Sequence, residues 1–166
     1  NMTAVALSWV ATSFLLASAV MLVPMGRLSD LYGRKKIYLI GMIIFTAGSL
    51  LAGLATSAAM LLFARVVQGM GGAMIFANGV AILTSVFPRE ERGRVLGVNV
   101  AAVYTGLSAG PFLGGLLTEH LGWRSVFLVT VPLGLFVILL VPWKLKGEWA
   151  DARGEPFDFT GAVIYG

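Results

Sequence analysis

The chain alternates between long apolar runs and short polar breaks. Residues 2–26 and 37–56 contain no charged side chain, and the polar stretch GRLSDLYGRKK lies between them. A helix needs about 20 apolar residues to cross the hydrocarbon core of a bilayer. Five runs reach this length, and a sixth begins near residue 159. The runs are too long and too uniformly apolar for barrel strands, so we expect helices.

The sequence therefore predicts an all-α integral membrane protein. The expected spans lie near residues 5–25, 37–57, 60–86, 95–118 and 124–143. We assign residues 1–144 to one transmembrane bundle, residues 145–158 to a polar connector and residues 159–166 to the start of a further helix. Both ends lie in apolar sequence and no signal peptide is visible, so we expect a fragment of a longer protein.

Composition supports the membrane class. Hydrophobic residues make up 58% of the chain and charged residues 12%, about half the share of a soluble domain. A net charge of +4 is also compatible with nucleic-acid binding, but the distribution of the bases favours another cause. There is no cysteine, so the chain has neither a disulfide nor a thiol site.

The bases predict an orientation in the membrane. They gather in three alternate breaks, GRLSDLYGRKK, PREERGR and KLKGEWADARGE, whereas TSAA (56–59) and TEHLGW (118–123) contain no Lys or Arg. Membrane proteins concentrate Lys and Arg in their cytoplasmic loops. We therefore expect the three basic breaks in the cytoplasm and the first span to run from outside to inside.

The first polar break contains one acid among four bases, with the spacing G-x-L-x-D-x-x-G-R-K. This pattern resembles the loop signature of the major facilitator superfamily, between its second and third helices. In that family the loop acts as a conformational latch. The resemblance implies this role for Gly26, Asp30, Gly33, Arg34 and Lys35. A carboxylate partner for Arg34 in the next basic break, Glu90 or Glu91, is a further hypothesis.

A second motif, LLFARVVQGMGGA at residues 61–73, places Arg65 inside the third span. A charge at the centre of a membrane helix costs about 2.5–3.5 kcal/mol, so Arg65 either snorkels to the interface or faces the bundle interior. The stretch resembles the fourth-helix motif of the superfamily. The resemblance implies a role in proton coupling for Arg65, Gln68 and Gly69. A dinucleotide fingerprint is excluded because a helix, not a strand, precedes the glycines.

A third motif, GLSAGPFLGG, resembles the fifth-helix signature that marks antiporters in the superfamily and accompanies export by exchange. Its residues are Gly106, Gly110, Pro111, Gly114 and Gly115. We expect Pro111 to kink the helix and the glycines to allow close packing. GLSAG also matches the nucleophile elbow of hydrolases. The chain has a single histidine, His120, at a membrane edge, so an intramembrane enzyme is disfavoured.

The last span begins with GWRSVFLVTVPLG, which resembles a pattern of the fourteen-helix drug:proton antiporters. Thr130 stands where that family often has Asn. The short polar connection after Pro142 also suits fourteen helices rather than twelve, although the number stays open. The resemblance implies a major facilitator N-terminal bundle, incomplete, whose partners are a missing first helix and a C-terminal bundle of the same protein.

Every acid of the chain lies in or beside a polar break, so we expect the proton-accepting carboxylate outside this chain. We expect no metal and no cofactor, with a proton gradient as the energy source.

The sequence thus predicts a multi-pass transporter of the cell (inner) membrane that exports drugs or other small amphipathic compounds by alternating access, and not an enzyme. Candidate cavity residues are Asn78, Asn99 and Tyr104. Two alternatives stay open: an exporter of a defined metabolite such as a sugar, amino acid or siderophore, and a non-transporting sensor on the same scaffold. The substrate, the coupling ion (H⁺ or Na⁺) and the oligomeric state also stay open.

Overall fold

The computed structural model describes residues 4–145, which form helices joined by short turns. The helices are α1 (Ala4–Tyr32), α2 (Arg34–Gly53), α3 (Ala58–Val86), α4 (Arg89–Leu121), α5 (Arg124–Leu128) and α6 (Thr130–Lys144). Within residues 4–145, five helical stretches are long and apolar enough to cross a membrane, with α5 and α6 together making the fifth. The all-α expectation is therefore confirmed. The expected connector beyond Leu145 and the helix at residues 159–166 lie outside the described residues.

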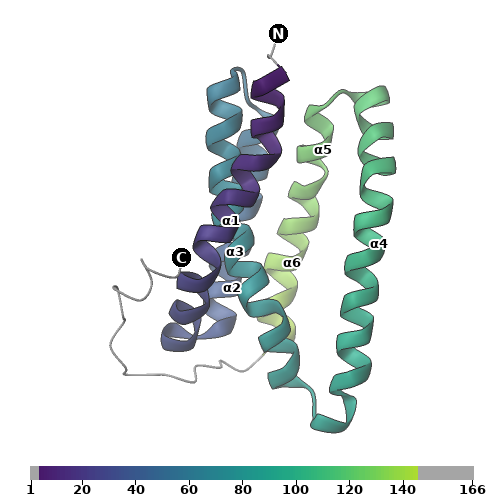
Figure 1. The fold of residues 1–166 in the computed structure, drawn as a ribbon. Coiled ribbons are helices and arrows are strands. Elements are labelled where there is room, and N and C mark those ends of the chain that lie inside the picture. Colours follow the sequence, from purple (N-terminus) through teal and green to yellow (C-terminus); the bar gives the residue numbers. More distant parts are fainter. Residues whose placement is uncertain (1–3, 146–166) are drawn as a thin grey trace.

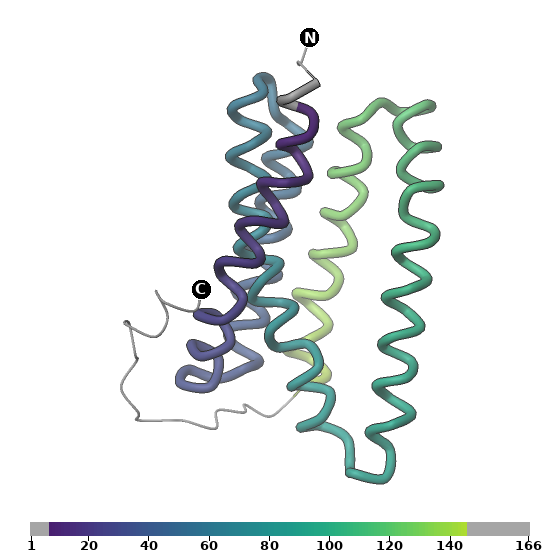
Figure 2. Tube along the Cα trace, viewed as in Figure 1, coloured from purple at the N-terminus to yellow at the C-terminus, as the bar shows by residue number. Residues whose placement is uncertain are grey.

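The helices run up and down between two ends of a bundle (Figures 1 and 2). The turn at Gly33 and the turn at residues 87–88 lie at one end, which we call the basic end. The turns at residues 54–57 and 122–123 lie at the opposite end. In the described residues, α3 packs on α1 and α2, and α5 and α6 pack on α2.

Small residues allow α2 and α3 to approach closely. A methyl group added at Gly48 would come 2.9 Å from the backbone nitrogen of Gln68 on α3, closer than real side chains come. Between membrane helices, hydrophobic attraction is weak and close backbone packing supplies much of the association energy. The contact at Gly48 therefore fixes how α2 and α3 cross near the polar side chains described below.

The basic breaks are shorter than the sequence predicts. The stretch at residues 26–36, predicted to be a loop, is helical except for Gly33, whose φ is 108°. One glycine in this conformation reverses the chain because it carries no Cβ to clash. Likewise α4 already begins at Arg89, directly after Pro88, whose extended backbone (ψ 159°) marks the residue before the helix. Hence the charged residues of both breaks lie on helix ends.

Helix α4 differs from the expectation for its antiporter-like motif. It runs uninterrupted from Arg89 to Leu121 through Pro111, and its trace in Figure 2 shows no sharp bend, so the expected kink is absent. A single lost backbone bond can be absorbed when adjacent turns stay bonded. Methyl groups at Gly106, Gly110, Gly114 and Gly115 would meet nothing within 4 Å. In the described residues α4 contacts only α3 and α5, so close packing of this stripe is not found there.

Candidate functional site

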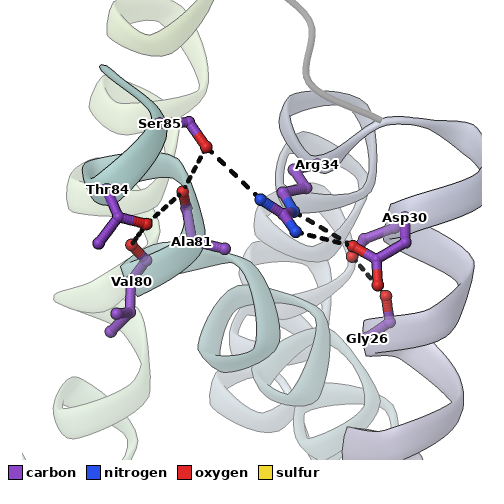
Figure 3. A network of polar contacts seen from close by, with 8 residues as sticks. Gly26, Asp30, Arg34, Val80, Ala81, Thr84 and Ser85 are labelled. Carbon is purple, nitrogen blue, oxygen red and sulfur yellow. Dashed lines mark hydrogen bonds and ion pairs between the residues drawn. The ribbon is translucent and has the colours of Figure 1, made fainter. Parts of the chain in front are cut away.

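The polar cluster at the basic end is centred on Arg34, the first residue of α2. Its Nε and Nη2 donate to Oδ1 of Asp30 at 3.2 and 3.0 Å, across the turn at Gly33 (Figure 3). Its Nη1 donates to the hydroxyl of Ser85 on α3 at 3.5 Å. The side chains of Arg34 and Asp30 are 18% and 33% exposed. One guanidinium therefore joins the ends of α1, α2 and α3, and we call this set the Arg34 cluster.

The structure thus brings together the residues expected to form a latch. The contacts given for Arg34 are with Asp30 and Ser85. A pair with Glu90 or Glu91 stays a prediction. Asp30 lies only 4 residues before Arg34, although the two belong to different helices, because the chain reverses at Gly33 alone. Ser85 was missed, since a serine near a helix end is common and carries no signal of its own.

The remaining latch candidates lie at the same end. Gly26 faces α3, where a methyl group would reach ordinary contact with Ala77 at 3.9 Å. Gly33 is buried and takes the positive φ that favours glycine. Lys35 donates from Nζ to the carbonyl of Leu145, just past the end of α6. These contacts tie α1 to α3 and α2 to α6 around the Arg34 cluster.

Nearer the opposite end, Arg65 of α3 points into the bundle. Its Nε donates to the carbonyl of Val10 on α1 at 2.8 Å, and Nη1 donates to Oε1 of Gln68 at 2.5 Å. Nε2 of Gln68 donates in turn to the hydroxyl of Ser49 on α2 at 2.7 Å. Of the two orientations that the sequence left open, the structure shows the inward one. A polar chain therefore links α1, α3 and α2.

Aromatic rings complete the surroundings of Arg65. Its Cζ lies 4.4 Å from the ring centroid of Phe14 and 5.8 Å from that of Phe127, both within the range of cation–π attraction. Neighbouring Gly69 allows this approach of α1, because a methyl group there would lie 2.5 Å from the carbonyl oxygen of Phe14. The contacts found for the guanidinium are thus a carbonyl, an amide and two ring faces. Nothing in the sequence marked Phe14 or Ser49 as neighbours of the arginine.

The three candidate cavity residues are not brought together. Asn78 is 0% exposed, and its Nδ2 donates to the carbonyl of Met74 at 2.7 Å. Its Oδ1 has no hydrogen-bond partner among the described residues. Asn99 borders a cavity of about 460 Å³ between α3 and α4, which Glu91 and Arg94 also line. Tyr104 is 66% exposed on α4. Of the three candidates, Asn99 is thus the one that borders this cavity.

The structure defines a multi-pass membrane protein with a charged cluster at one end and an inward arginine nearer the other. Among residues 4–145, no group of three or more His, Cys, Asp or Glu side chains is placed to hold a metal ion. The model of the Major Facilitator Superfamily matches residues 1–158, and the chain belongs to this family of membrane transporters. The family recognised from the motifs is confirmed, and with it the expectation of a transporter rather than an enzyme.

Individual relatives are similar over nearly the whole chain. The multidrug resistance protein Stp of Mycobacterium tuberculosis is 39% identical over 160 residues, which is 96% of this chain and 30% of the relative. The cephamycin export protein CmcT of Amycolatopsis lactamdurans is 41% identical over 95% of this chain and 33% of its own length. The riboflavin transporter RibZ of Clostridioides difficile is 31% identical over 96% and 35%. The chain thus spans about a third of these relatives.

Proposed function

We propose that the whole protein is a proton-coupled secondary transporter that exports drugs or other small amphipathic compounds by alternating access. The observation that carries this proposal is the inward Arg65, held by Val10 and Gln68 within a motif that resembles that of proton-coupled family members. Names of relatives support the substrate class, since Stp is described as a multidrug resistance protein and CmcT as a cephamycin export protein. On this proposal the protein has fourteen helices and resides in the cell (inner) membrane.

The placement of Arg65 suits coupling for a physical reason. A charge within a membrane span is costly and persists where it faces the bundle interior and has polar partners. Arg65 meets both conditions, and its partners lie on α1 and α3. The positive charge of Arg65 would raise the free energy of any further positive charge nearby. A bound proton and a bound cationic compound would therefore be costly to hold at the same time, and one would tend to displace the other. The proton-accepting carboxylate would belong to the rest of the protein.

The Arg34 cluster suits a latch in the same cycle. Alternating access requires contacts at one end of a bundle that form in one state and break in the other. Arg34 joins three helix ends through one carboxylate oxygen and one hydroxyl, so a small displacement of any of these ends would break the set. On this proposal the basic end faces the cytoplasm. A first helix and a C-terminal bundle complete the transport pathway.

A second function is favoured by one specific observation. RibZ, which covers almost the whole chain, is described as a riboflavin transporter, so transport of one defined metabolite is the runner-up. Such a protein would keep the proton coupling and the latch, and it would differ in the residues that line the substrate cavity.

The test uses the full-length parent protein in an efflux-deficient bacterium. Accumulation of a panel of lipophilic cations is followed with and without a protonophore, for the unchanged protein, Arg65→Ala and the control Arg89→Ala, an exposed arginine at the start of α4. We expect protonophore-sensitive efflux that Arg65→Ala abolishes and Arg89→Ala retains. If no panel compound is exported, the metabolite transporter or the sensor replaces the drug exporter. If efflux survives Arg65→Ala, the coupling role moves to another residue.

A further inference from the structure

Arg65 belongs to a longer row of arginine and aromatic side chains. Successive members are in contact across α5, α3, α1 and α2. Cζ of Arg124 lies 4.5 Å from the ring centroid of Trp123, whose ring meets Phe127 edge to face at 6.2 Å. Phe127 faces Arg65, Arg65 faces Phe14, and Phe14 meets Phe45 edge to face at 6.5 Å. The arginine–aromatic row, in order, is Arg124, Trp123, Phe127, Arg65, Phe14 and Phe45.

The end of the row at Arg124 is anchored to a turn. Nη2 of Arg124 donates to the carbonyl of Ala55 at 2.8 Å, in the turn between α2 and α3. Phe127, one turn further along α5, packs on a buried cluster of Ala52, Ala55, Leu61 and Ala64. The same turn region therefore holds both Arg124 and Phe127. A displacement of α5 relative to α2 would change the position of the Phe127 ring against Arg65.

The last span continues in helical form beyond Phe127. Val129, between α5 and α6, keeps helical backbone angles (φ −65°, ψ −26°), and its N–H donates to the carbonyl of Ser125 at 2.9 Å. The hydroxyl of Thr130 donates to the carbonyl of Phe127 at 2.6 Å. The two rings that face Arg65 therefore come from different helices, Phe127 from the last span and Phe14 from α1.

We propose that Phe127 is a positioning residue for Arg65: its ring holds the guanidinium inward against Phe14 and links it, through Trp123 and Arg124, to the turn at Ala55. The proposal rests on the coupling role given to Arg65 in the proposed function. It adds a route by which movement at the end of the bundle opposite the basic end changes the surroundings of the coupling residue. It also gives a role to Arg124, a basic residue at the end of the bundle where the predicted breaks have few Lys or Arg residues.

The first test measures the exposure of Arg65 directly and does not depend on transport. Full-length protein in detergent is treated with phenylglyoxal, which modifies guanidinium groups, and the modification of Arg65 is followed by mass spectrometry with exposed Arg94 as internal reference. The variants are Phe127→Leu, Phe127→Tyr and Phe63→Leu. Tyrosine keeps the ring, and Phe127 borders a cavity that leaves room for the hydroxyl. Phe63 is 64% exposed on the same helix as Arg65 and serves as the matched control.

We expect Arg65 to be modified roughly three- to ten-fold faster in Phe127→Leu, the range that corresponds to loss of one partly buried cation–π contact. Phe127→Tyr and Phe63→Leu should keep the rate of the unchanged protein. An unchanged rate in Phe127→Leu would overturn the proposal. Faster modification in Phe127→Tyr or Phe63→Leu would also overturn it, because the effect would then come from general loosening rather than from the ring.

The second test separates coupling from folding. Uphill proton-driven efflux and energy-independent exchange of the same substrate are compared in proteoliposomes. Phe127→Leu should lower uphill efflux several-fold, while exchange stays near the level of the unchanged protein. Phe127→Tyr should keep both activities near that level. Equal losses of both activities would contradict the positioning role and indicate a folding defect. If the unchanged protein shows no proton-linked efflux, the proposed function fails, and the modification rates alone still decide whether Phe127 positions Arg65.

Discussion

Arg34 donates from Nη1 to the hydroxyl of Ser85 at 3.5 Å, while its other two donors share a single oxygen of Asp30. The contact of Arg34 with α3 is therefore made to a neutral side chain, at the junction of three helix ends. The hydroxyl of Ser85 itself donates to the carbonyl of Ala81 on its own helix at 2.8 Å. Of these three contacts of Arg34, the link to α3 is the longest.

Ser85→Asp should strengthen this link. Hydrogen bonds to a charged partner contribute about 1.5–3 kcal/mol, compared with about 0.5–1.5 kcal/mol for neutral pairs, and partial exposure reduces the gain to about 1 kcal/mol. We expect a higher melting midpoint of the full-length protein in detergent and slower efflux, because the latch must break in each cycle. Ser85→Ala serves as the comparison and should change both quantities little. A lower midpoint for Ser85→Asp would show that α3 does not take part in the latch.

The pair of Asp30 and Arg34 should be energetically coupled, but weakly. Both side chains are partly exposed, and ion pairs of this kind contribute about 0.2–1 kcal/mol. A double-mutant cycle with Asp30→Asn, Arg34→Gln and the double variant should give a coupling free energy in this range, measured by unfolding of the full-length protein. The coupling should fall at high salt, since exposed charges are screened. If no coupling free energy is measured at low salt, the contact between Asp30 and Arg34 does not stabilise the protein.

Gly69→Ala should destabilise the packing of α1 on α3. The added methyl group would lie 2.5 Å from the carbonyl oxygen of Phe14 and 2.9 Å from Cβ of Ala17, and neither atom can move without shifting the helix. Overpacking of this kind costs about 1–3 kcal/mol. The loss should appear as a lower melting midpoint, together with lower efflux because Arg65 depends on the same approach of α1.

Gly79→Ala on the same helix is the matched control for this prediction. A methyl group there meets nothing within 4 Å, so the change should only improve helix propensity, by up to about 1 kcal/mol. Equal melting midpoints for the two variants would mean that α1 and α3 are further apart in the membrane than in this structure.

Much of the fold could be predicted from the sequence because its signals are long and local. A run of about 20 apolar residues between charged breaks predicts a helix wherever it occurs. The turn at Gly33 could not be bounded in this way, since charge and polarity suggested a loop while only backbone conformation shows where a helix ends. The one-residue break at Val129 was not predicted either, although Pro132 has no N–H to bond the carbonyl of Leu128 and is a signal for it.

The candidate site could be predicted only in part. The spacing of charged residues pointed to Arg34 and Arg65, since a charge beside or within an apolar run is conspicuous. Their partners were not predictable, because Ser85 and Val10 lie 51 and 55 residues away from them and contribute a hydroxyl and a carbonyl, which every helix carries. Packing between helices decides these contacts. Asn78 shows the opposite failure, since a polar side chain in a span suggested a cavity and the structure buries it completely.

Asn78→Thr should therefore leave transport unchanged and raise stability. A buried acceptor without a partner costs about 1–3 kcal/mol, and Oδ1 of Asn78 has none among the described residues. Threonine is similar in size, its hydroxyl can donate to the carbonyl of Met74 as Nδ2 now does, and a methyl group would replace the unpartnered oxygen. Thr46 on α2 makes the same contact to the carbonyl of Met42 at 2.7 Å.

The control is Asn99→Thr, the same exchange at a residue that borders a cavity, where no gain in the melting midpoint is expected. Melting midpoint and efflux should be measured on the same preparations of full-length protein. A gain at Asn78 without change in efflux would assign the residue to packing, because a side chain that contacts the substrate cannot lose its carbonyl oxygen without effect. A loss of efflux or a lower midpoint would instead mean that Oδ1 accepts a hydrogen bond from a donor in the rest of the protein or from the substrate.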